Sequence, residues 1–361
     1  MEKSIKQRNS NIELLRIIAI LMVIISHFCV HGGIQLINTN NMSINMFLVQ
    51  ILHLGAISNH IFIIITGYFL INSKPKYSKI IKLILELFVY SVVIALFVSV
   101  FDRDQIGVKS IIKTLLPIFW GNWFIIYYVI LYFFSPYINY FINKVPKKEL
   151  QKCILLMIVL FCLIPTFTKN VWKFTEHDIF ILDYFIGSYI RLYFKDSNFK
   201  SKKWLILFGG FVLVMELIIA FGGILTNNNN LLMNIMYVIG TNYSIFTLIL
   251  AVLMFWTFNN IKIKNNRIIN NISASVLGIY IIHENDFIRD WLWKEFWPNT
   301  MYINSNFFII HLILKVILVF SVCLIIDKIM KLLFGNFEER LSEKIYNFIK
   351  RIFDKSLLKS L

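Results

Sequence analysis

The sequence predicts an all-α, polytopic membrane protein with about ten transmembrane helices. Of its 361 residues, 58% are hydrophobic and the mean hydropathy is +0.70, whereas soluble domains are typically about 45–50% apolar. The apolar runs are too long, and alternate too weakly, for a transmembrane β-barrel. The third observation is the spacing of the basic residues, which cluster between the apolar runs.

Ten apolar segments are close to the ~20 residues that cross the hydrocarbon core of a bilayer. Lys3, Lys6 and Arg8 precede the first segment as in a signal peptide. Arg16 inside that run, and the lack of a small-residue cleavage site, predict instead a retained span. The eighth segment is long enough to tilt or to begin in the interface. In chain order the predicted spans are 12–31, 46–71, 79–100, 121–142, 151–168, 177–194, 204–222, 231–258, 272–288 and 305–332.

Lys and Arg residues are unevenly divided between the segments that join these spans. With the N-terminus inside, 25 of the 36 fall in cytoplasmic segments, 7 in outer segments and the remaining 4 within spans. This bias predicts that both termini are cytoplasmic. The net charge of +16 is therefore interpreted as a topology signal, and no nucleic acid is expected as a partner.

The chain is predicted to hold a transmembrane domain over 1–332 and a basic amphipathic cytoplasmic tail over 333–361. Apolar residues of the tail are spaced among Lys, Arg and Glu in a pattern typical of a helix on the inner leaflet. The aromatic loop at 288–302 is either an interfacial belt or a lid over the outer opening. Four Cys lie in apolar runs without a CxxC pair, which indicates structural thiols.

The first predicted span carries two polar residues that a span normally avoids. Arg16 and His27 are eleven positions apart, so at about 100° per residue they share nearly one helix face, about 16 Å apart along the axis. Ionisable groups inside a span are costly and usually mark a functional path. We therefore expect an anion-binding end at Arg16 and a proton-transfer end at His27.

Four other polar groups are expected at the depth of His27: His53 and His60 on the second span, and His283 and Glu284 on the ninth. Acyl transfer to a hydroxyl needs such a set, because a base must remove the alcohol proton and a carboxylate can fix the tautomer of that base. His27, His283 and Glu284 are therefore candidate catalytic residues. His27 is either the base or a transient acyl carrier.

Two arginines near the predicted cytoplasmic side are candidates for binding the phosphates of a CoA donor. Arg16 and Arg191 both offer the planar guanidinium that binds phosphate bidentately. Glu13, one turn before Arg16, is assigned to the same donor site. The alternative for each arginine is that its side chain only extends to the lipid headgroups.

The remaining intramembrane polar residues carry no assigned role. A lone His in a span often only hydrogen-bonds a neighbouring helix, which is the expectation for His53 and His311. Glu86 and Glu216 either pair with Lys315 or line a cavity.

Metal binding is not expected from the sequence. His27 and His31 have i, i+4 spacing, but no HExxH motif or other ligand set accompanies them. His31 is expected at the outer interface, where it needs no role. No Walker loop or GxGxxG motif is present, so nucleotide hydrolysis is unsupported.

Five stretches resemble the membrane acyltransferase-3 family, in the family's order over nearly the whole chain. RNSNIELLRIIAILMVIISHF places Arg16 and His27 at the family's spacing of Arg, ten residues, His, and Glu13 where many members are acidic. His60 departs from the pattern, because relatives more often have Asn or another small polar residue there. The other similar stretches are HIFIIITGYFL, NWFIIYYVILYFFSPYIN, YFIGSYIRLY and SVLGIYIIHEN.

The resemblance implies ten membrane helices, an acyl-CoA donor on the cytoplasmic side, and acyl transfer to hydroxyls of extracytoplasmic sugars. The IHEN-like ending resembles O-acetyltransferases of capsular or exopolysaccharides. We therefore expect an enzyme of the bacterial plasma membrane, in contact with membrane lipids, that uses acetyl-CoA and a glycan or lipid-linked sugar acceptor. The alternative is a transporter or flippase for the same glycans, whose signature is broken helices and paired repeats.

Overall fold

The computed structural model describes residues 8–34, 43–101, 107–120, 123–169, 171, 178–194, 200–226, 228, 234, 238 and 240–357. Every regular element in these residues is a helix, which confirms the all-α prediction. The helices are α1 (Ser10–His31), α2 (Ile44–Ile51), α3 (Gly55–Leu70), α4 (Tyr77–Phe101), α5 (Val108–Leu115), α6 (Pro117–Trp120), α7 (Trp123–Lys144), α8 (Lys147–Ile158), η3 (Val159–Leu163), α9 (Ile164–Thr168), α10 (Ile179–Tyr193), α11 (Ser201–Leu225), α13 (Ile245–Asn260), α14 (Arg267–Ser273), α15 (Val276–His283), α16 (Asp286–Asp290), η4 (Trp291–Glu295), η5 (Asn299–Met301) and α17 (Phe308–Leu357).

Within the described ranges, seven helical segments are long and apolar enough to cross a membrane. They are α1, α2 with α3, α4, α7, α8 with α9, α11 and α17. The other three predicted spans correspond to the shorter helices α10 and α13 and to the interrupted pair α14 and α15. The polytopic membrane class is confirmed, whereas the count of ten and the cytoplasmic termini stay predictions. Lys3, Lys6 and most of the segment 227–239 lie outside the described residues.

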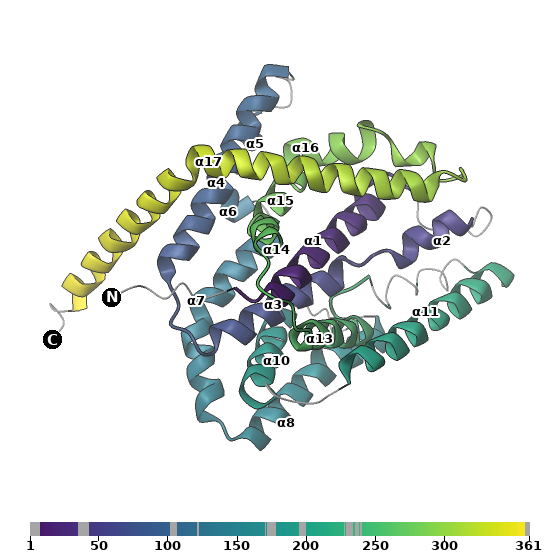
Figure 1. The fold of residues 1–361 in the computed structure, drawn as a ribbon, viewed down its shortest axis with the longest axis horizontal. Coiled ribbons are helices and arrows are strands. Elements are labelled where there is room, and N and C mark those ends of the chain that lie inside the picture. Colours follow the sequence, from purple (N-terminus) through teal and green to yellow (C-terminus); the bar gives the residue numbers. More distant parts are fainter. Residues whose placement is uncertain are drawn as a thin grey trace.

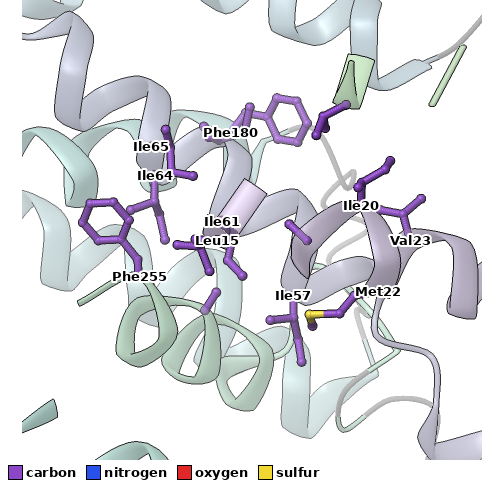
Figure 2. Close-up of a cluster of buried hydrophobic side chains, with 14 of the residues drawn as sticks. Leu15, Ile20, Met22, Val23, Ile57, Ile61, Ile64, Ile65, Phe180 and Phe255 are labelled. Carbon is purple, nitrogen blue, oxygen red and sulfur yellow. The ribbon is translucent and has the colours of Figure 1, made fainter. Parts of the chain in front are cut away.

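Helices α1 and α3 form the centre of the bundle. α1 runs through the middle of the molecule and contacts α3, α13, α15 and α17, while α3 also packs against α10 (Figure 1). Figure 2 shows the core that these helices share, in which Leu15 of α1, Ile61 and Ile64 of α3 and Phe255 of α13 lie together, all fully or almost fully buried. The centre of the bundle is therefore apolar. A polar side chain on α1 needs a hydrogen-bond partner or a cavity outside this apolar core.

Two glycines allow α3 and α10 to cross in backbone contact. A Cβ atom on Gly67 would collide with the backbone of Tyr184, and one on Gly187 would collide with the carbonyl of Ile64. Small residues at helix crossings permit such close approach in membrane proteins. The TGY and IGS stretches are therefore explained as the two sides of one helix crossing.

A buried ion pair joins the same two helices. Nδ1 of His60 lies 2.8 Å from both carboxylate oxygens of Asp183, and its Nε2 donates to the carbonyl of Asn242 at 2.9 Å. Both residues are 1% exposed. His60 thus has a structural partner on each side of its ring.

The C-terminal helix does not break where the tail was predicted to begin. α17 is continuous from Phe308 to Leu357, so the boundary at 332/333 falls inside it. In Figure 1 this helix crosses the whole bundle before it extends beyond α4. The tail is therefore a direct extension of the last span.

Candidate active site

A cavity of about 330 Å³ lies along one face of α1. Arg16, Ile20 and Val23 line it at the i, i+4, i+7 spacing of a single face. Arg8 adds a second cation, and Tyr280 of α15 lines the wall as well. The next position on the same face of α1 is His27, about 6 Å beyond Val23 along the axis.

Arg16 presents an unpaired guanidinium atom to this cavity. Its Nε is buried and has no hydrogen-bond partner among the described residues. Glu13, which was assigned to the same donor site, instead accepts a hydrogen bond from Ser273 and ties α1 to α14. Arg16 is half-buried and has no anionic partner among the described residues. Such a cation within a membrane bundle is costly, so this end of the cavity is suited to an anionic ligand.

The other end of the α1 face carries the cluster that was predicted from the sequence. Nδ1 of His27 lies 3.1 Å from Oε2 of Glu284 and is hydrogen-bonded to Nε2 of His283 at 3.1 Å. Nε2 of His31 lies 3.5 Å from the same Glu284 oxygen. The structure therefore brings His27, His283 and Glu284 together and adds His31.

The hydrogen bonds fix the tautomer of both catalytic candidates. Nδ1 of His283 contacts the carbonyl of Ile279, and because a carbonyl only accepts, that nitrogen must donate. In a neutral ring, Nε2 of His283 is then an acceptor, so the hydrogen of the bond to His27 sits on Nδ1 of His27. Nε2 of His27, for which no hydrogen bond is found in the described part of the chain, retains its lone pair. That atom is suited to take up a proton.

A break in the helix positions Glu284. α15 ends at His283 and Glu284 is its C-cap residue, after which Asn285 caps α16 by accepting from the Phe287 amide. Nη1 of Arg289, in α16, donates to Oε1 of Glu284 at 3.1 Å and so fixes the orientation of the carboxylate. The side chains of His27 and Glu284 are 18% and 12% exposed, so the cluster remains accessible.

The aromatic loop at 288–302 packs over this cluster. Trp293 is fully buried, with its ring centroid 6.4 Å from that of His283. Lys315 of α17 donates to the carbonyls of Trp293 and Trp297 and to Oδ1 of Asn299 at 2.8–3.3 Å. Lys315 therefore anchors the loop, and the predicted alternative that it pairs with Glu86 or Glu216 is wrong.

Three other sequence-predicted residues lie elsewhere. Arg191 does not line the cavity, because its guanidinium stacks on Tyr68 at 4.9 Å and donates to the Tyr68 hydroxyl. His60 is engaged with Asp183, and His53 is a buried residue of the turn between α2 and α3. His60 therefore has its partners on α10 and at Asn242 and not in the His27 cluster, while the depth expected for His53 stays a prediction.

Sequence reasoning missed three residues of the site: Arg8, His31 and Arg289. His31 had a signal, because its i, i+4 spacing from His27 places it on the same face. Arg289 follows Glu284 by five positions across a helix break that no hydrophobic pattern reveals. Arg8 counted only toward the charge bias of the N-terminus.

Comparison with known proteins gives one match. The profile of the acyltransferase-3 family, described as an acyltransferase domain, matches residues 9–328. This range covers α1 to the first 21 residues of α17 and includes every residue of the cavity and the cluster except Arg8. Searches of curated proteins and of solved structures found no match.

Proposed function

Because the chain belongs to the acyltransferase-3 family and is a multi-pass membrane acyltransferase, we propose that it is an O-acetyltransferase of the bacterial plasma membrane. The donor is acetyl-CoA, and the acceptor is a hydroxyl of a cell-surface or exported polysaccharide. The observation that carries this proposal is the cavity along α1, which has two arginines at one end and lies on the face of α1 that continues to His27.

The donor end of the proposed path is the pair Arg8 and Arg16. A CoA donor is polyanionic at its nucleotide and slender and mostly uncharged along the arm that bears the thioester. The cavity has the same polarity, with arginines at one end and Ile20, Val23 and Leu277 further along. Guanidinium groups bind phosphate through paired, charge-assisted hydrogen bonds.

The chemical step uses the free nitrogen of His27. Nε2 of His27 takes the proton of the acceptor hydroxyl, whose oxygen attacks the thioester carbonyl carbon. The carbon–sulfur bond then breaks, and the CoA thiolate leaves and receives the proton. Glu284, 3.1 Å from Nδ1, stabilises the imidazolium formed in this step. His283 is a positioning residue, because it reaches the reaction through its hydrogen bond to Nδ1 of His27.

The proposal is tested with the purified full chain in liposomes, supplied with acetyl-CoA labelled in its acetyl group. We expect label to appear in ester linkage on a polysaccharide acceptor taken from the native envelope, with release of free CoA. The matched control is label carried in the CoA moiety, which must not appear on the glycan. Glycan movement across the bilayer without any need for acetyl-CoA would instead support the transporter alternative.

A further inference from the structure

The three ligand-type atoms around Glu284 converge as they do around a metal ion. One ring nitrogen each of His27 and His31 and a carboxylate oxygen of Glu284 all lie within 4.8 Å of one another. Nδ1 of His27 lies 3.1 Å from Oε2 of Glu284, and Nε2 of His31 lies 3.5 Å from the same oxygen. Bonds of 2.0–2.1 Å in a tetrahedral zinc site place neighbouring ligand atoms roughly 3.3 Å apart.

Oε2 of Glu284, the carboxylate oxygen of this group, is buried, contacts the two imidazoles and has no hydrogen-bond partner among the described residues. Its neighbour Oε1 is held by Arg289, which in turn lies 3.4 Å from Asp286. Such an outer partner orients a ligating carboxylate, and Asp286 offsets the positive charge of Arg289.

The donor chemistry and the access also fit zinc. Two imidazoles and one carboxylate form a ligand set that proteins use for Zn²⁺ with a fourth position open to water. The side chains of His27, His31 and Glu284 are 18%, 24% and 12% exposed, so an ion can reach them. Magnesium and calcium prefer oxygen ligands and are not matched to this set.

We propose that His27, His31 and Glu284 form a zinc site whose occupation blocks the acyl-transfer step. Zinc at Nδ1 of His27 replaces the hydrogen that this atom shares with His283. The neutral ring keeps its single proton, which now sits on Nε2. Nε2 then has no lone pair for the proton of the acceptor hydroxyl. The blocking rests on the proposed function, whereas zinc binding does not.

Binding is measured directly on the purified full chain by competition with a zinc indicator, without any acyl substrate. We expect one zinc per chain, and at least about a tenfold loss of affinity in His31→Ala and in Glu284→Gln. Loss of even an outer partner of a metal ligand typically lowers affinity 10- to 100-fold. His53→Gln and Cys29→Ser are the matched controls, because both residues are buried and neither belongs to the group of converging ligand atoms, and both variants must bind zinc as the wild type does.

Inhibition is measured as each variant's acetyl transfer with added zinc divided by its own transfer with a chelator. We expect this ratio to fall at least tenfold in the wild type and to stay near one in His31→Ala. An absence of stoichiometric zinc binding to the wild type, or equal affinity in His31→Ala, would overturn the site. Equal inhibition of both proteins would overturn the blocking. Zinc binding that follows the expected pattern in a chain without any acetyl transfer would uphold the site and contradict the proposed function instead.

Discussion

The roles proposed for Arg16 and His27 are complementary, and the two residues lie at the two ends of one helix face. Helical periodicity predicted that both residues share one face of a helix. α1 is continuous from Ser10 to His31, so this periodicity applies over its whole length. Their partners were harder to predict. Glu13 contacts Ser273, 260 positions away in the chain, and Arg16 faces the cavity instead of Glu13. Long-range contacts of this kind depend on the fold, so the spacing of residues within one helix does not predict them.

The anion-binding role of Arg16 predicts a specific effect of a charge-conserving change. Arg16→Lys loses the bidentate geometry, so we expect the dissociation constant for acetyl-CoA to rise roughly tenfold, or about 1.4 kcal/mol. Arg16→Ala should weaken binding further. Equilibrium binding of labelled acetyl-CoA to the purified protein measures both.

Arg191→Lys is the matched control for Arg16→Lys. Its guanidinium contacts Tyr68 and does not line the cavity, so acetyl-CoA affinity should stay at the wild-type level. If Arg191→Lys weakened binding as much as Arg16→Lys, the donor site would not be where we place it.

The pattern of apolar residues predicted well where helices lie in the sequence, but it predicted poorly where those helices are interrupted. Each of the ten predicted spans overlaps a helix, but the second is divided at residues 52–54 and the ninth at 274–275 and 284–285. The breaks at 52–54 and 274–275 hold mostly apolar or small residues, so hydrophobicity does not reveal them. The third break holds Glu284 and Asn285, which are only two polar residues at the end of an apolar run. The break after His283 matters most, since it turns Glu284 out of the helix toward both His27 and His31.

The crossing of α3 and α10 predicts that one methyl group destabilises the bundle. Gly187→Ala forces a Cβ atom into the carbonyl of Ile64, and overpacking of this kind typically costs about 1–3 kcal/mol. We expect a lower thermal midpoint in detergent. Gly210→Ala is the matched control, because a Cβ atom there meets open space on α11; equal midpoints in the two variants would refute the close crossing.

The anchoring of the loop over the site by Lys315 is testable in the same way. Lys315→Met leaves the carbonyls of Trp293 and Trp297 without this donor, and an unsatisfied buried polar group costs about 1–3 kcal/mol. We expect faster proteolysis within 291–301. Lys294→Met, which removes only a half-exposed lysine paired with Asp290, should leave the proteolysis rate unchanged.

The proposed reaction requires the donor and acceptor ends of α1 to face opposite sides of the membrane. The charge bias predicts that the Arg16 end lies in the cytoplasm and the His27 end outside. Lys294 lies in η4 beside the cluster, and Lys202 lies at the start of α11. These two exposed positions therefore report the two sides.

Cysteine labelling in intact cells tests this orientation. Lys294→Cys should react with a membrane-impermeant maleimide without permeabilisation, and Lys202→Cys should react only after it. The four native cysteines are the background, and three of them are buried. The reverse pattern of labelling would place the His27 cluster in the cytoplasm and would remove the case for an extracytoplasmic acceptor.

In the proposed mechanism Nε2 of His27 takes up a proton during acyl transfer, and the variant His27→Gln tests this step. Gln retains hydrogen-bonding capacity but cannot accept a proton near neutral pH, so the variant separates proton transfer from packing. We predict that acetyl transfer by His27→Gln falls at least about 100-fold while the protein accumulates in the membrane at the wild-type level, with His53→Gln retaining activity. Near-normal acetylation by His27→Gln would contradict this mechanism and leave His27 with a structural role only.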